Sequence, residues 1–127
     1  MSEQKKGKIL VVDDDITLRD MYAERLRAEG YEVEIAQDGE QGINRANTFK
    51  PDLILLDIMM PKINGFTALD ILKTTPGLKD IPVILLTALI QEDNKTKGIQ
   101  GGAADYIVKS ETMPKEVIEK IEKLIKK

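Results

Sequence analysis

Five residues with reactive side chains follow or end short aliphatic runs of this sequence: Asp13, Asp14, Asp57, Thr87 and Lys109. Asp57 is the most informative, because the apolar run "LILL" stops on its carboxylate, a group that is expensive to take out of water. Oxygen ligands without His or Cys favour Mg²⁺ over zinc, since Mg²⁺ takes one or two carboxylates, keeps waters and binds phosphate oxygens. If the runs are neighbours in space, we expect Asp57 to be balanced by Mg²⁺ and by the lysine.

An alternation of apolar runs and helical patterns would bring these residues together. The runs have the length of strands, and between them apolar residues recur at helical spacing, as at Leu18, Tyr22 and Leu26. Five strands alternating with five helices predict an α/β fold, in which a parallel sheet is covered on both faces and the crossovers are right-handed. The ligand site of such a sheet lies beyond the carboxyl ends of its strands. The predicted strands are Lys8–Val12, Val33–Ala36, Leu53–Leu56, Pro82–Thr87 and Tyr106–Lys109.

Capping residues mark where several of the helices should begin. Asp38, with Gln41 three residues later, has the pattern of a helix N-cap, and Asn64 stands in the same position before the third helix. The last helix follows Pro114 and is amphipathic, so it should cover one side of the sheet.

The fourth helix should be weaker than the others. Between Gln91 and Gly102 only Ile99 is strongly apolar, and Gly98 interrupts the segment. Glycine in a helix costs roughly 1 kcal/mol relative to alanine. The pattern therefore predicts a marginal, mobile helix.

Composition limits the chemistry and the partners that the chain can have. Its 127 residues suit one domain, and 42% hydrophobic with 4% aromatic residues indicate an aliphatic core. Without Cys or His there is no thiol nucleophile, zinc–thiolate site or imidazole base. A formal charge of -3 argues against a general attraction to nucleic acid or to a membrane. The polar N-terminus has no apolar stretch of the kind that a signal peptide needs, so we expect a cytoplasmic protein.

Each candidate residue also has an ordinary structural interpretation. Taken alone, the run from Asp13 to Asp15 is more typical of a cap and of acids that complement a helix dipole, and we assign Asp15 to that role. An Asp that ends a buried strand commonly begins a loop, and a Lys or Thr there ordinarily faces solvent. The functional interpretation rests on the joint occurrence of these residues in this chain order.

Four motifs, "ILVVDDD", "PDLILLDIMMPKINGF", "PVILLTA" and "GGAADYIVK", make this sequence similar to response-regulator receiver domains, the phospho-acceptor modules of two-component signalling. The similarity extends from about Lys8 to the C-terminus. It implies a flavodoxin-like, doubly wound sheet with strand order 2-1-3-4-5. It also implies one receiver domain over residues 1–127, with a polar tail at 1–7, and we expect no output domain.

The resemblance further implies an acceptor and a metal site. Asp57 would accept a phosphoryl group from a phosphohistidine on a sensor histidine kinase or a phosphotransfer protein. Mg²⁺ would be bound by Asp14, by Asp57 and by the backbone carbonyl of Met59, while Asp13 would act through water. The chain would catalyse only its own phosphorylation and dephosphorylation.

A switch is implied as well. Thr87 and Lys109 would contact the phosphoryl oxygens, and Tyr106 would report the state of the site by changing rotamer. The face built from the fourth helix, fifth strand and fifth helix would then bind a downstream target protein. One departure from the family pattern is Ser110, which follows Lys109 where receiver domains usually carry Pro.

Three alternatives compete with this interpretation. Enzymes of the haloacid-dehalogenase type want a second Asp two residues after the nucleophile, and Met59 occupies that place. In a flavodoxin-like FMN carrier the first strand leads into a Ser/Thr/Gly loop, whereas here it leads into acids that repel phosphate. The third alternative, a receiver-like protein-interaction module that is never phosphorylated, stays open at this point.

Overall fold

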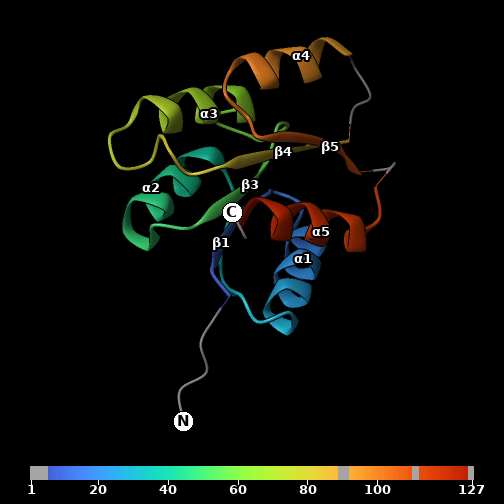
Figure 1. The fold of residues 1–127 in the computed structure, drawn as a ribbon. Helices are drawn as coiled ribbons and strands as arrows, with labels where there is room; N and C mark the ends of the chain where they lie inside the picture. The colour runs from blue at the N-terminus through green and yellow to red at the C-terminus, as the bar shows by residue number, and fades with distance from the viewer. Residues whose placement is uncertain (1–5, 89–91, 110–111, 126–127) are drawn as a thin grey trace.

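The computed structural model describes residues 6–88, 92–109 and 112–125, and it confirms the predicted α/β architecture (Figure 1). Five parallel strands form one sheet in the order β2-β1-β3-β4-β5. The strands are β1 (Lys8–Val12), β2 (Glu32–Ala36), β3 (Leu53–Asp57), β4 (Val83–Thr87) and β5 (Asp105–Val108). The helices are α1 (Ile16–Ala28), α2 (Gly39–Phe49), α3 (Gly65–Thr74), α4 (Glu92–Gln100) and α5 (Pro114–Ile125).

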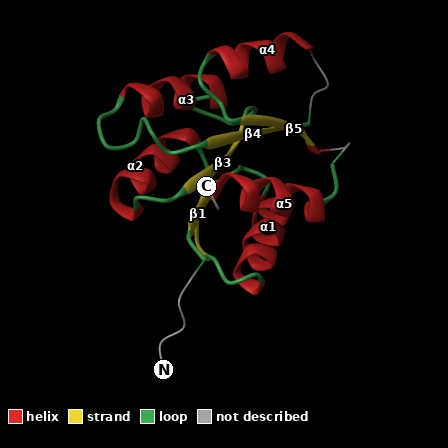
Figure 2. Ribbon diagram, viewed as in Figure 1, coloured by secondary structure: helices red, strands yellow, loops and turns green. Residues whose placement is uncertain are grey.

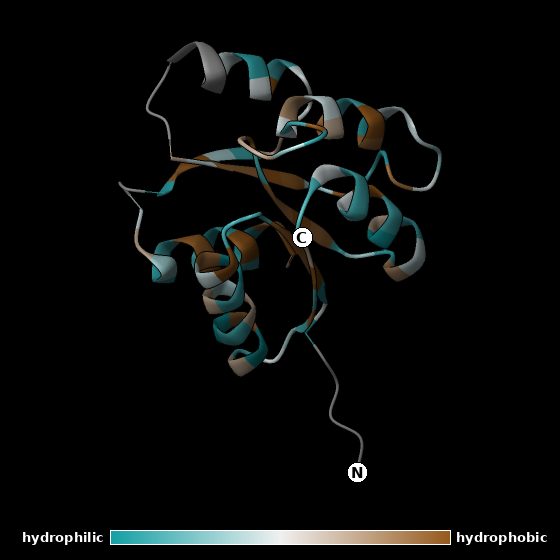
Figure 3. Cartoon of the chain, turned by 180° about the vertical axis from the view of Figure 1, so that it is seen from behind, coloured by the Kyte–Doolittle hydropathy of each residue, from teal (hydrophilic) through white to brown (hydrophobic). Residues whose placement is uncertain are grey.

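Helices cover both faces of the sheet (Figures 1 and 2). Alternate residues of each strand point to opposite faces, so β1 sends Ile9 and Val11 toward α1 and α5, and Leu10 and Val12 toward α2 and α3. The strands are therefore apolar on both sides and appear as the brown centre of the molecule in Figure 3. This two-sided core fixes the register of the strands, and the register places the residues that follow them.

The strand bounds differ from the predicted ones by one residue at several ends. Strand β2 begins at Glu32, β3 includes Asp57, and β4 begins at Val83 rather than at Pro82. Pro82 has no N–H to donate, although its carbonyl accepts a hydrogen bond from the Ile54 N–H at 3.0 Å. Strand β5 ends at Val108, so Lys109 follows the strand instead of ending it.

The predicted caps are confirmed. Asp38 accepts from the backbone N–H of Gln41 at 2.8 Å, and Asn64 accepts from that of Thr67 at 3.0 Å. Asp15, which we had assigned to a capping role, accepts from the N–H of the residue three positions later at 3.1 Å. These bonds satisfy donors that a helix start leaves without partners.

Gly98 has a packing role that its sequence context did not indicate. A Cβ atom at this position would lie 2.5 Å from Cδ1 of Leu85, whose side chain is fully buried in β4. Glycine thus lets α4 approach the sheet closely, and it is more than a weak point of the helix. The mobility of α4 stays a prediction.

Candidate functional site

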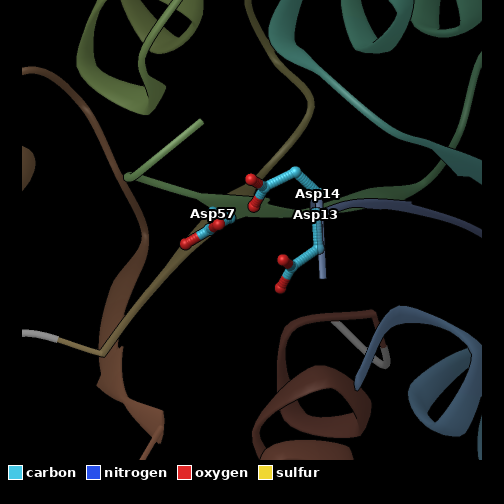
Figure 4. Close-up of side chains that lie close together, drawn as sticks. All are labelled: Asp13, Asp14 and Asp57. Atoms are coloured by element: carbon cyan, nitrogen blue, oxygen red, sulfur yellow. The ribbon is translucent and has the colours of Figure 1, made fainter. Parts of the chain in front are cut away.

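Three carboxylates meet at the carboxyl edge of the sheet. Val12 of β1 pairs with Leu56 of β3, so the next residues, Asp13 and Asp57, lie side by side. Each of Asp13, Asp14 and Asp57 offers one carboxylate oxygen, and these oxygens lie within 4.8 Å of one another (Figure 4). Asp13 is fully buried and Asp57 is 3% exposed, whereas Asp14 is exposed. The predicted convergence of the acids therefore occurs.

Lys109 reaches into this cluster from the end of β5. Its Nζ lies 2.8 Å from Oδ2 of Asp13 and 3.4 Å from Oδ1 of Asp57, and its side chain is 15% exposed. The other oxygen of Asp13 accepts from the N–H of Asp15 at 2.9 Å. Asp13 is thus engaged through both oxygens, while Lys109 provides one cation for two buried acids.

The surroundings shift the pKa values of Asp57 and Lys109. Burial raises the pKa of Asp57 from 3.8 to about 7, the negative charge of Asp13 adds to the rise, and Lys109 opposes it. Burial alone would lower the pKa of Lys109, but its hydrogen bond to Asp13 and the charges of Asp57 and Asp13 outweigh burial and raise it. The negative charge exceeds what one lysine balances, which is the environment that a divalent cation would relieve.

The remaining predicted site residues lie at the same edge or next to it. Thr87 is the last residue of β4 and is fully buried, and it pairs with Val108, the residue before Lys109. Met59 stands two residues beyond Asp57, and 57% of it is exposed. Tyr106 lies within β5, with its ring against the core cluster on the α2 and α3 side and its hydroxyl shielded from solvent. Because Asp57 pairs with Leu86, the structure brings Thr87 next to the acids. The peptide bond from Lys109 to Ser110 lies outside the described residues.

A contact between two further residues at this edge, Asp38 and Lys62, was not predicted from the sequence. Asp38 was predicted only as a helix cap, and Lys62 was not singled out. Lys62 Nζ lies 3.6 Å from Oδ2 of Asp38, which joins the loop after β3 to the start of α2. The sequence offers only a weak signal for this contact, a lysine inside the turn-forming stretch "PKING".

Comparison with known proteins identifies the family. The model of the response regulator receiver domain matches residues 9–122. This chain belongs to the receiver domain family. The transcriptional regulator RpaA of Synechocystis, named as DNA-binding, is 43% identical over 102 residues, which cover 80% of this chain and 42% of RpaA. The DNA-binding response regulator MtrA of Mycobacterium tuberculosis is 36% identical over 116 residues, covering 91% of this chain and 49% of MtrA.

Solved receiver domains have the same fold. The receiver domain of Francisella response regulator 1452 superimposes with a TM-score of 0.87 at 32% identity, covering 94% of this chain and 97% of that one. The BeF3-activated receiver domain of Klebsiella pneumoniae RstA gives a TM-score of 0.86 at 31% identity, covering 94% of this chain and 99% of that one. The fold of this chain therefore agrees with that of solved members of the same family.

Membership of the family sets the general role of the chain. Receiver domains are phosphorylation switches of two-component systems, act as signalling domains rather than as enzymes on other substrates, and generally bind Mg²⁺ at an acidic pocket. Response regulators interact with histidine kinases and with downstream targets. The chain spans about half the length of the first curated relatives it matches. Within the described residues, no helix is both long and apolar enough to cross a membrane.

Proposed function

We propose that this receiver domain accepts a phosphoryl group on Asp57 from a phosphohistidine of a sensor histidine kinase or a phosphotransfer protein. The observation that carries the proposal is the placement of the Asp57 carboxylate, which lies at the end of a central strand beside two other acids and 3.4 Å from Lys109. A carboxylate is a competent nucleophile that needs no general base, which suits a chain without His.

In the proposed transfer, an oxygen of Asp57 forms a bond to phosphorus while the bond from phosphorus to the histidine nitrogen breaks. The electron pair of the broken bond stays on the imidazole, which leaves as the neutral base when the phosphohistidine was protonated. Lys109 stabilises the charge that gathers on the phosphoryl oxygens, and its position between Asp13 and Asp57 holds it within reach of them. Because phosphoryl transfer depends mainly on positioning and charge stabilisation, these residues meet most of its demands.

The residues present fit a Mg²⁺ ion. All the side-chain donors of the cluster are carboxylate oxygens, the ligand type that Mg²⁺ prefers. Burial first, and then the charge of Asp13, raises the pKa of Asp57, and a bound cation would offset both effects. Asp14 and Asp57, with the backbone carbonyl of Met59, would hold the ion, and Asp13 would act through water because both its oxygens are engaged. When bound, Mg²⁺ supplies positive charge that neutralises the acids and the phosphoryl oxygens.

Phosphorylation then acts on Thr87 and Tyr106. The hydroxyl of Thr87 would donate to a phosphoryl oxygen, and its movement would free space for the Tyr106 ring to change rotamer. The hydroxyl of Tyr106 is shielded from solvent, and a Cβ atom at Gly98 would lie 3.6 Å from Cδ2 of its ring. The ring therefore lies under α4, and its rotation would alter the surface formed by α4, β5 and α5. That surface would bind the downstream target.

The proposed partners of this domain are proteins. RpaA and MtrA are named as DNA-binding, but this chain covers only 42% and 49% of their lengths, and its formal charge is -3. Phosphate contacts in DNA complexes are made mainly by Lys and Arg, so an acidic chain suits protein contacts better. We also propose a cytoplasmic location, where a sensor kinase would present its phosphohistidine.

Incubation with acetyl phosphate and Mg²⁺, followed by intact-protein mass spectrometry, tests the proposal. The parent should gain one phosphoryl mass, and Asp57→Asn should gain none. A parent that stays unlabelled under these conditions would favour the alternative, a receiver-like interaction module that is not phosphorylated.

A further inference from the structure

The loop between β3 and α3, residues 58–64, contains a turn with unusual backbone geometry. The N–H of Ile63 donates to the carbonyl of Pro61 at 2.8 Å, and Lys62 between them has a φ of +69°. A three-residue turn with positive φ is a γ-turn of the less common kind, and residues with side chains rarely adopt it. Such a conformation persists only where the surroundings hold it in place.

The start of α2 supplies one of these restraints. A Cβ atom at Gly39 would lie 2.7 Å from the carbonyl oxygen of Ile63 and 3.1 Å from its Cβ. No residue other than glycine fits at this approach without moving the backbone of the loop. The loop after β3 therefore rests directly on the first residue of α2.

An ion pair supplies the second restraint. Asp38 is 9% exposed in its side chain and uses its two oxygens for different tasks. Oδ1 accepts from the N–H of Gln41 at 2.8 Å and so belongs to the cap of α2, while Oδ2 lies 3.6 Å from Nζ of Lys62. The residue in the strained turn is thus tied to the buried end of a helix.

The other end of the loop is fixed to the sheet. The N–H of Ile58 donates to Leu86 O at 3.0 Å, and the N–H of Gly65 donates to Ile58 O at 2.8 Å. Met59 stands between this anchor and the turn at Lys62. The position of its backbone carbonyl consequently depends on both anchors.

We propose that Asp38, Gly39 and Lys62 are positioning residues for the Mg²⁺ site, which hold the β3–α3 loop so that the Met59 carbonyl faces the ion. The inference rests on the proposed function, because it takes this carbonyl as a ligand. Partners that orient metal ligands typically affect affinity strongly, although they never touch the metal.

For the substitution Lys62→Met, charge alone and a positioning role predict opposite changes in Mg²⁺ affinity. Lys62 is a cation near an acidic site, and removing it should by charge alone favour the binding of another cation. If Lys62 instead positions the loop, Lys62→Met weakens Mg²⁺ binding. Because the lysine is 61% exposed and such pairs are weak, the expected loss is roughly two- to fivefold in the dissociation constant.

The experiment measures the Mg²⁺ dissociation constant by titration calorimetry, and the stability without Mg²⁺ by urea unfolding. Lys62→Met should bind more weakly, and Lys62→Arg, which keeps the ion pair, should restore affinity. Gly39→Ala should weaken binding about tenfold, since it displaces backbone rather than a side chain. If that variant does not fold, the lysine variants decide.

A matched control comes from the same protein. Lys50 is also exposed and has a positive φ of 54°, but it ends α2 at the opposite edge of the sheet. Lys50→Met changes the net charge equally and should leave Mg²⁺ affinity unchanged. Unchanged or tighter binding by Lys62→Met, or equal weakening by both lysine variants, overturns the inference while the Mg²⁺ site stands. A parent that does not bind Mg²⁺ removes the proposed function itself.

Discussion

Replacing Asp57 with Asn is expected to stabilise the folded protein at neutral pH when Mg²⁺ is absent. Burial, with the charge of Asp13 acting in the same direction and Lys109 against it, raises the pKa of Asp57 from 3.8 to about 7. Between these values the folded state keeps a proton that the unfolded state has released. The free energy of unfolding of the parent therefore falls as the pH rises from about 4 to 7.

The size of the effect follows from the width of that window. Each pH unit between the two pKa values corresponds to about 1.4 kcal/mol, so ionised Asp57 lowers the stability by at most about 4 kcal/mol above pH 7. Asp57 is only 3% exposed, which limits screening by solvent. In Asp57→Asn, Lys109 keeps its contact with Asp13 at 2.8 Å, so no buried charge loses its only partner. We expect a gain of about 2–4 kcal/mol at pH 7.5.

Urea unfolding followed by circular dichroism, with EDTA present, measures this gain between pH 4 and 8. The difference between Asp57→Asn and the parent should be small at pH 4, where the Asp57 carboxyl of the folded parent is protonated, and should reach its full value above pH 7. Asp70→Asn, which neutralises an exposed acid on α3, should show no comparable change. A parent whose stability relative to Asp57→Asn is constant or rises across this range would refute the reasoning.

Three further predictions concern the metal, α4 and the lifetime of the phosphoryl group. Asp14→Asn should weaken Mg²⁺ binding more than Asp13→Asn in calorimetric titrations, because both oxygens of Asp13 are already engaged; equal losses would contradict this. Gly98→Ala should lower the free energy of urea unfolding by about 1–2 kcal/mol, since crowding against Leu85 outweighs the roughly 1 kcal/mol gained in helix propensity; a more stable variant would disprove the close contact. Met59→Asn should speed the loss of phosphate with Mg²⁺ saturating, because Met cannot hold an attacking water by hydrogen bonds, and about 1.4 kcal/mol of barrier gives tenfold; an unchanged or longer lifetime argues against that role.

Local patterns were enough to predict the elements and the edge where the site lies. The run "LILLD" is buried along its whole length because both faces of a parallel sheet are covered, and an apolar run that ends on Asp57 therefore marks the edge of the core. The caps at Asp38 and Asn64 were predictable for a similar reason, since their hydrogen bonds join residues three positions apart. The predicted topology then placed Asp13, Asp57, Thr87 and Lys109 at one edge of the sheet.

Contacts between distant segments could not be predicted in the same way. Lys109 lies closer to Asp13 than to Asp57, a preference of side-chain geometry that strand order does not specify. The pair between Asp38 and Lys62 joins loops 24 positions apart, and the positive φ of Lys62 has no signature in its residue type. Leu89 stands two residues after Thr87, a position that predicts a place beside the phosphoryl group, and it lies outside the described residues.

The central claim is that Asp57 carries the phosphoryl group, and chemical trapping tests it most directly. After incubation with acetyl phosphate and Mg²⁺, borohydride reduces an aspartyl phosphate to the corresponding alcohol, which marks the modified residue for peptide mass spectrometry. We expect reduction at Asp57 in the parent, and none at Asp13 or Asp14. Reduction at either of those residues, or phosphate that survives in Asp57→Asn, would contradict it.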